Sequence, residues 1–270
     1  MNNIGKNYFD IGQMDTLASG NSFLHRLDPR AKLITTLVFI LSVVSFDKYA
    51  LSALTPFFIY PVILITFARL PRLYLFKKVL WASPFAILVG MFNPLIDQEI
   101  LLQLGPIGVS GGWISFLSIF IRCLLTVTAA LILVSLTGFN AVAQALLKLG
   151  VPKYFVVQLL FFYRYIFVLT DEAERMVRAR AMRTFKSGVM GFKTFIPLIG
   201  HLLLRTLDRA ERIYLAMCCR GFDGNVRMLK TMKIRRQEII FTLAWIGVFA
   251  LFRGINIPMK IGELLIGAWK

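Results

Sequence analysis

The chain has 270 residues, of which 57% are hydrophobic, and its 31 Lys and Arg against 14 Asp and Glu give a formal net charge of +17. The apolar residues form long continuous runs rather than the alternating patterns of a water-soluble core, which excludes an ordinary soluble domain. The composition therefore predicts an all-α integral membrane protein.

Five apolar segments approach the roughly 20 residues that a membrane-spanning helix needs. They are residues 31–46, 51–68, 79–96, 113–136 and 239–252. The first is short, and Asn93-Pro94 marks a kink or a helix end in the third. Pro258, Lys260 and Glu263 interrupt a sixth candidate at 255–269. The sequence therefore predicts five to six transmembrane helices.

Basic residues are distributed unevenly between these segments. Lys and Arg occur before the first span, at 69–78 and after the fourth span, whereas 97–112 contains neither. The positive-inside rule then places the N-terminus in the cytoplasm and returns the chain there after four crossings. The predicted regions are a cytoplasmic N-terminal segment (1–30), a four-helix transmembrane region (31–136), a cytoplasmic region (137–236) and a C-terminal helix with its tail (237–270).

The cytoplasmic region is predicted to contain amphipathic helices. Residues 154–169 are apolar, but they number only about sixteen and include Gln158 and Arg164, which favours a helix on the inner leaflet over a crossing. Residues 171–186 place acidic side chains first and basic ones last, as the helix dipole favours. A further helix at about 201–220 is expected to end at Gly221, because glycine accepts the left-handed conformation there.

Each of the last two helices ends in an arginine between small residues. The triplets are Ala179-Arg180-Ala181 and Cys219-Arg220-Gly221. Small neighbours suit an arginine that inserts into a protein groove, and its planar guanidinium pairs with carboxylates and carbonyls in a fixed geometry. Binding to lipid headgroups is the alternative for each arginine taken alone. The two helices together predict a docking module for soluble partners.

Three stretches also carry a resemblance to a known family. RYIFVLTDEAERMVRARAMR (164–183) and RAERIYLAMCCRGFDG (209–224) resemble the transmembrane T component of energy-coupling-factor (ECF) transporters. MDTLASGNSFLHRLDPRAKL (14–33) resembles the cobalt/nickel, CbiQ-like branch of that family. The resemblance covers residues 14–224, and the first triplet departs from the family's Ala-Arg-Gly pattern by having Ala181.

The resemblance implies a non-catalytic scaffold in an ATP-driven importer of a bacterial or archaeal inner membrane, with the N-terminus and the coupling helices in the cytoplasm. Its implied partners are two ABC ATPase subunits, or a homodimer of one, and a substrate-binding membrane S subunit, with or without a small accessory membrane subunit. The two triplets would dock into the ATPases. Cobalt or nickel is the implied cargo, and a vitamin-type ECF transporter is the alternative.

The chain itself shows no pattern for a cofactor or a metal. Its two histidines, His25 and His201, are far apart, and no glycine loop for phosphate ends in Lys-Ser or Lys-Thr. Neither a bound metal, nor ATP, nor another cofactor is therefore expected on this chain, and metal selection is assigned to another subunit.

Two other classes of protein are alternatives to the scaffold. An interfacial membrane enzyme would need paired acidic residues, for which Asp171-Glu172 is the candidate pair, with Arg164 beside it. A nucleic-acid-binding anchor would need aromatics among its basic residues, and 178–186 offers only Phe185, so no nucleic acid is expected as a partner. Arg122, within the fourth span, is expected either to make a structural or subunit contact or to reach the interface.

Overall fold

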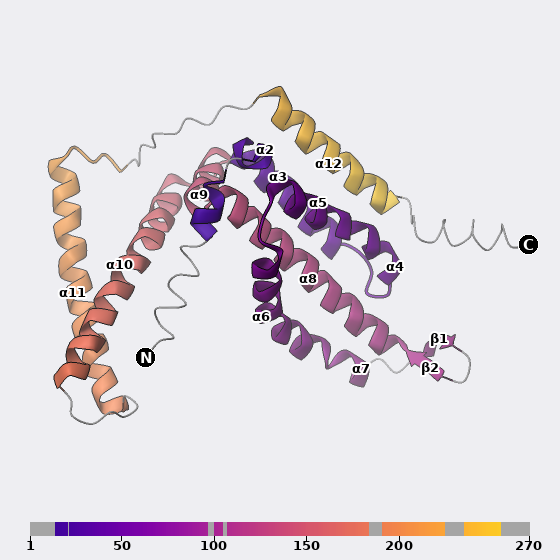
Figure 1. Cartoon of the computed structure of the whole chain (residues 1–270), viewed down its shortest axis with the longest axis horizontal. Coiled ribbons are helices and arrows are strands. Elements are labelled where there is room, and N and C mark those ends of the chain that lie inside the picture. The colour runs from indigo at the N-terminus through magenta and orange to yellow at the C-terminus, as the bar shows by residue number, and fades with distance from the viewer. Residues whose placement is uncertain are drawn as a thin grey trace, which may run out of the picture. The chain divides into compact units, whose positions relative to one another are not determined.

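The computed structural model describes residues 14–20, 22–96, 100–104, 107–183, 191–224 and 235–254. These residues are helical apart from one β-hairpin and the connecting turns (Figure 1). The described chain divides into two compact units. The first, the membrane unit, comprises the described residues of 14–142 together with 235–254, and the second, the coupling unit, those of 143–224.

The membrane unit contains most of the apolar helices. In chain order its elements are α2 (Phe23–Arg26), α3 (Pro29–Val44), α4 (Leu51–Leu54), η1 (Thr55–Phe58), α5 (Ile59–Ala68), α6 (Arg72–Gly90), α7 (Asn93–Ile96), β1 (Ile100–Leu104), β2 (Ile107–Ser110), α8 (Gly111–Thr137) and α12 (Arg236–Gly254). The helix α9 (Phe139–Lys148) leads from it into the coupling unit, which holds α10 (Lys153–Arg183) and α11 (Phe192–Cys219).

Five described helical segments are long and apolar enough to cross a membrane, which confirms the all-α membrane fold. They are Leu51–Ala68, Arg72–Gly90, Gly111–Thr137, Lys153–Arg183 and Arg236–Gly254. Four of them correspond to predicted spans. The predicted first span forms α3, whose 16 residues cover only about 24 Å at 1.5 Å per residue. The predicted tail helix at 255–269 lies outside the described residues.

The predicted start of the third span lies later in the chain than the start of the helix that the structure shows there. The helix α6 begins at Arg72 instead of residue 79 and ends at Gly90, after which the separate turn α7 begins at Asn93. The predicted break at Asn93-Pro94 is therefore confirmed, but Lys77 and Lys78 lie inside α6 rather than in a loop. Long basic side chains are accommodated in a helix near the interface because their stems are apolar.

The segment 97–112, expected to be a loop, contains a short antiparallel hairpin. Strands β1 and β2 pair Leu104 with Ile107 and Gln103 with Gly108. The hairpin leads directly into α8, the longest helix of the membrane unit. Close packing follows at the start of α8, where a Cβ on Gly90 of α6 would lie 2.7 Å from the Phe116 ring.

The core of the membrane unit is a cluster of buried aromatic rings. Phe39 of α3 stacks on Tyr60 of α5, with ring centroids 4.5 Å apart, and lies 5.4 Å from the ring of Phe249 in α12. Phe57 of η1 stacks on Phe249 at 6.1 Å. All four side chains are at most 2% exposed. The short helix α3 thus lies at the centre of the unit, between helices from both ends of the sequence.

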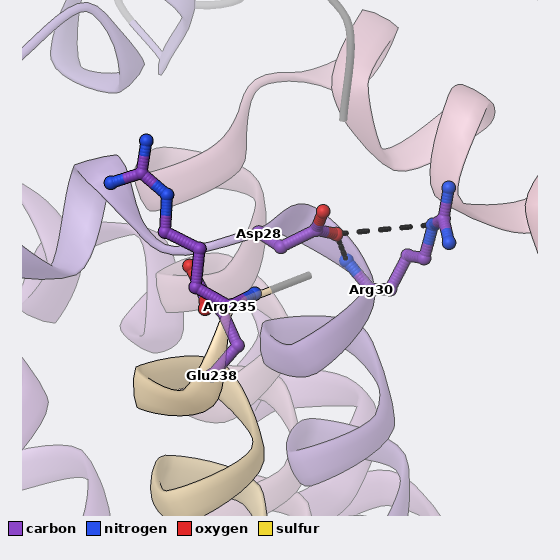
Figure 2. A network of polar contacts seen from close by, with 4 residues as sticks. All are labelled: Asp28, Arg30, Arg235 and Glu238. Atoms are coloured by element: carbon purple, nitrogen blue, oxygen red, sulfur yellow. Dashed lines mark hydrogen bonds and ion pairs between the residues drawn. The ribbon is translucent and has the colours of Figure 1, made fainter. Parts of the chain in front are cut away.

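Carboxylates cap the first turns of α3 and α12 (Figure 2). Asp28 Oδ1 accepts a hydrogen bond from the Arg30 backbone N–H at 2.9 Å, and the Arg30 Nε lies 3.9 Å from the same oxygen. Glu238 Oε2 accepts a 2.7 Å hydrogen bond from the Arg235 backbone N–H. Both carboxylates satisfy amides that a helix leaves without an intrahelical partner and suit its positive end.

Residues from the beginning of the membrane unit also make hydrogen bonds at the C-terminal end of α8 and the start of α9. The buried Lys32 donates from Nζ to the carbonyl oxygen of Leu136 at 3.1 Å, in the last turn of α8. Gly138 follows with a φ of +75°, and Asp15 Oδ1 accepts a 3.4 Å hydrogen bond from the Phe139 N–H at the start of α9. A cation near the negative C-terminal end of a helix and a carboxylate near the positive N-terminal end both interact favourably with the helix dipole.

Candidate coupling site

The predicted docking helices are longer than expected. The sequence predicts successive helices at 154–169 and 171–186, but α10 runs without interruption from Lys153 to Arg183. No Pro or Gly separates the two segments, and Thr170 Oγ1 donates to the Ile166 carbonyl at 2.7 Å while the helix continues. Asp171 is therefore in the middle of a helix, and the predicted first-turn position of the acidic residues is wrong.

The length of α10 also bears on whether this helix crosses the membrane. The segment 154–169 alone is too short to span a bilayer, but the 31-residue helix that contains it is long and apolar enough by composition. Gln158 and Arg164 remain within its apolar part. The cytoplasmic placement of α10 therefore stays a prediction that depends on its polar residues and on the charge of the segment, not on length.

Two sets of contacts join α10 to α11. The Glu172 carboxylate receives a 2.6 Å hydrogen bond from Arg205 Nη1, and Arg209 Nη2 lies 3.9 Å from its other oxygen. Phe161 packs against Phe222, just beyond α11, with ring centroids 6.4 Å apart. A residue in the first part of α10 therefore contacts a residue just beyond the end of α11. The two helices run antiparallel (Figure 1).

The C-terminus of α11 is closed by a Schellman motif. The Phe222 N–H donates to the Met217 carbonyl and the Gly221 N–H to the Cys218 carbonyl, both at 3.0 Å. Gly221 has a φ of +77°, the left-handed conformation predicted for it. Arg220 is therefore held at the C-cap of α11, while the Phe222 ring packs on α10.

The two arginines lie at opposite ends of this helix pair. Because Phe161 faces Phe222 and Glu172 faces Arg205, the antiparallel register places Arg180 opposite approximately residue 200 of α11. The interval from there to Arg220 is about twenty residues, or roughly 30 Å along the helix axis. The structure thus separates the predicted arginine sites instead of combining them into one.

The predicted triplets differ in exposure. Ala179 and Arg180 are half-buried, whereas Ala181 is exposed near the end of α10. In the second triplet, all three residues are exposed: Cys219, Arg220 and Gly221.

The contact between Glu172 and the arginines of α11 was not predicted from the sequence. The i,i+4 pair Glu174–Arg178 is also present, with 3.5 Å between its closest atoms, but it lies within one helix. Glu172 instead reaches Arg205, 33 residues later, and no local spacing signals such a partner. The contact also gives the Asp171-Glu172 pair a structural explanation, since the Glu172 carboxylate is occupied by guanidinium groups.

An apolar face of α11 is left exposed within its own unit. Ile196, Leu203, Leu207 and Tyr214 recur at helical spacing and are 57–67% exposed. The helix α10 leaves these four side chains uncovered. This face is available to another apolar surface, a lipid or a partner protein.

The histidines have ordinary surroundings. His25 Nε2 lies 3.0 Å from the Leu17 carbonyl oxygen and its Nδ1 lies 2.6 Å from Ser22 Oγ. Burial lowers the pKa of His25; the bond to Leu17 opposes this shift and the charge of Lys32 adds to it. His201 is exposed on α11. Among the residues that the structure describes, no group of three or more His, Cys, Asp or Glu is placed to hold a metal ion.

Arg122 makes a contact within the membrane unit. Its Nη2 donates a hydrogen bond to the backbone carbonyl of Asp47, in the loop between α3 and α4. The side chain therefore reaches from α8 to a connecting loop, where the carbonyl partly compensates the cost of its charge. Of the two expectations for Arg122, the structure supports a structural contact within the chain.

Gly221 provides a direct test of the Arg220 geometry. Replacing Gly221 by Val should cost about 1–2 kcal/mol, because a side chain disfavours its left-handed backbone. If Arg220 docks into an ATPase, as the resemblance implies, its displacement should reduce the amount of ATPase that co-purifies with the chain. Gly224→Val is the matched control, since Gly224 also has a left-handed φ, of +79°, but lies beyond the cap of α11. Equal co-purification of Gly221→Val and wild type would show that the cap does not position Arg220.

Comparison with known proteins agrees with this architecture. The model of the CbiQ family, described as cobalt transport protein, matches residues 20–232. The chain is 31% identical to the energy-coupling factor transporter transmembrane protein EcfT of Listeria innocua over 222 residues, covering 76% of this chain and 82% of that protein. The corresponding EcfT of Bacillus subtilis is 30% identical over 234 residues, with 80% and 86% covered.

A third relative, the EcfT of Leuconostoc gelidum, is 29% identical over 251 residues, with 86% of this chain and 92% of that protein covered. The fold and the matches define a multi-pass membrane protein of the transporter class. The chain belongs to the CbiQ family, the family of ECF transporter T components.

Proposed function

We propose that this chain is the transmembrane scaffold of an ECF-type importer and couples ATP hydrolysis by two partner ATPases to movement of a substrate-binding membrane subunit. In this assignment the chain carries no catalytic group. Arg180 and Arg220, each with its small neighbours, insert into grooves of the two ATPases. The ATPases are two different subunits or two copies of one.

The placement of the two arginines is the observation that carries this proposal. One arginine near each end of an antiparallel helix pair, roughly 30 Å apart, suits two separate partners better than a single one. Arg220 is fixed by its helix cap, and Glu172 joins the two helices between the arginines. A movement of one arginine-bearing end of the helix pair is therefore transmitted to the other end, because the two helices are connected.

The proposed cycle follows from this connection. ATP binding draws the ATPases together, and the arginine-bearing ends move with them. The apolar face of α11, with Leu203 and Leu207 exposed, offers the S subunit an apolar surface that moves with the helices. The motion would reorient the S subunit so that its binding site opens to the cytoplasm.

Cobalt is the proposed cargo, with nickel as its close chemical relative. The support is the description of the matching family model and the N-terminal motif at 14–33. The chain would not select the ion, which is the task of the S subunit with or without a small accessory membrane subunit. A vitamin-type ECF transporter is the second candidate, favoured by relatives whose names specify EcfT without naming a metal.

The proposed location is a bacterial or archaeal inner membrane, with the N-terminus and the coupling unit in the cytoplasm. The basic residues of 69–78 and of the coupling unit support this orientation, because Lys and Arg favour the cytoplasmic side. In this topology α10 lies along the inner leaflet or against partner subunits instead of crossing.

Uptake measurements test the assignment of cargo. The chain, co-expressed with its partner ATPases and membrane subunits, should confer ATP-dependent accumulation of radioactive cobalt on cells without their own importer. A variant ATPase that cannot hydrolyse ATP is the control and should abolish uptake. Accumulation of a vitamin but not of cobalt or nickel would mean that the cargo is a vitamin. Uptake that does not depend on the ATPases would contradict the proposed scaffold function.

A further inference from the structure

An apolar groove lies between α5, α6 and α8 of the membrane unit. Its volume is about 690 Å³, within the range of about 300–1,000 Å³ that ligand sites occupy. Leu75 and Val79 are buried in it, whereas Val62 and Phe76 are 58% and 67% exposed. All three helices belong to candidate membrane spans. The groove is therefore open to the surroundings of the spans, which are hydrocarbon.

The polar atoms of the groove are almost all satisfied within the chain. The hydroxyl of Thr66 donates to the Val62 carbonyl at 2.8 Å, and that of Thr128 donates to the Leu124 carbonyl at 2.6 Å. Both threonines line the groove, but neither needs a hydrogen bond from a ligand. Among the described lining residues, Arg72 is the one charged side chain.

The charge lies at one end of the groove. Arg72 is the first residue of α6, and it is exposed. Arg69, three residues earlier, is also exposed. It is the C-cap residue of α5 and has a left-handed backbone conformation with a φ of +53°. Lys77 and Lys78 follow in the first two turns of α6. Arg72 thus gives the groove a positive charge at the turn between α5 and α6, the other basic residues lie beside the groove, and the rest of its lining is uncharged.

We propose that this groove binds one anionic phospholipid, with the lipid phosphate on Arg72 and an acyl chain along Leu75, Phe76 and Val79. These four residues follow the i, i+3, i+4, i+7 spacing of one helix face, so a headgroup at Arg72 places a chain over the other three. A guanidinium binds a phosphate through parallel N–H donors. A phospholipid matches both halves of the groove, whereas a free phosphate would match only the arginine.

Native mass spectrometry of the purified full chain tests the site directly. The chain is mixed with phosphatidylglycerol or with phosphatidylcholine of identical acyl chains, and the lipid-bound fraction is measured. The wild type should retain phosphatidylglycerol preferentially. Arg72→Ala should weaken its binding about fivefold, as expected for one basic residue at a membrane surface. Lys77→Ala, which removes a neighbouring charge outside the groove, should leave the binding within twofold of wild type.

A second variant tests the apolar half of the site. Val62→Trp fills the groove from an exposed position and should reduce the binding of both lipids, while circular dichroism verifies that its helix content is unchanged. An equal reduction in Arg72→Ala and Lys77→Ala would overturn the proposal in favour of general attraction to the basic loop. Undiminished binding in Val62→Trp would likewise place the lipid elsewhere.

The alternative occupant is a protein, and the assembled transporter distinguishes it. A photo-crosslinking amino acid in place of Phe76 should label phospholipid in the complete complex. Labelling of a partner subunit without any labelled lipid would overturn the proposal. The lipid site depends only on the membrane location of α5, α6 and α8, so its failure would leave the proposed scaffold function unaffected.

Discussion

Replacing both Arg180 and Arg220 by Glu is expected to abolish ATPase association and ATP-dependent uptake while the chain remains folded in the membrane. Each change introduces a negative charge where the proposal places a guanidinium inside a partner's groove. Breaking a buried, hydrogen-bonded charge pair at an interface costs about 2–5 kcal/mol, or at least 30-fold in affinity. Because the double variant breaks both pairs, co-purification of the ATPases should fall to background.

The single variants sharpen this test. Because the two arginines lie roughly 30 Å apart along the helices, Arg180→Glu and Arg220→Glu should each weaken one contact and leave the other. Arg212→Glu in α11 is a matched control, since it reverses an exposed charge away from both triplets. Normal association and uptake in the double variant would mean that the arginines bind lipid headgroups and that coupling uses other residues.

Phe39→Ala is expected to destabilise the membrane unit strongly. Phe39 is fully buried among the rings of Tyr60, Phe57 and Phe249, which belong to three other helical segments. Truncation of a buried Phe to Ala leaves a cavity and costs about 3–5 kcal/mol. The midpoint of unfolding in denaturant, followed by tryptophan fluorescence in detergent, should shift accordingly.

Phe85→Ala is the control for this truncation. It removes the same atoms from α6, but its side chain is 73% exposed, so the free energy of unfolding should remain within about 0.5 kcal/mol of wild type. An equally small effect at Phe39 would show that α3 is not the centre of the packing.

Much of this architecture was predictable from composition and from local signals. Long apolar runs identified most of the spans, and Asn93-Pro94 and Gly221 marked helix ends, because proline and glycine act through their own backbone geometry. The predicted start of α6 is too late because the first turns of this helix are basic, although a proline immediately precedes it. A purely apolar criterion does not detect such a turn.

The features that could not be predicted depend on contacts between distant segments. The Glu172–Arg205 contact joins two helices and has no periodicity, and the Lys32–Leu136 hydrogen bond connects residues 104 positions apart. The two triplets were found because arginine between small residues is a local pattern. Their placement near opposite ends of the helix pair required the antiparallel register, which only the contacts between the helices provide.

The aromatic core has a consequence for how the protein is made. Phe39 and Phe57 lie near the beginning of the chain, but Phe249, which packs against both, follows the coupling unit in the sequence. During synthesis from the N-terminus, the ribosome must therefore complete α10 and α11 before the core can close. The coupling helices emerge while the membrane bundle is still missing a helix. Insertion of α12 is thus the step that completes the bundle, and truncation before it leaves the Phe39 cluster open.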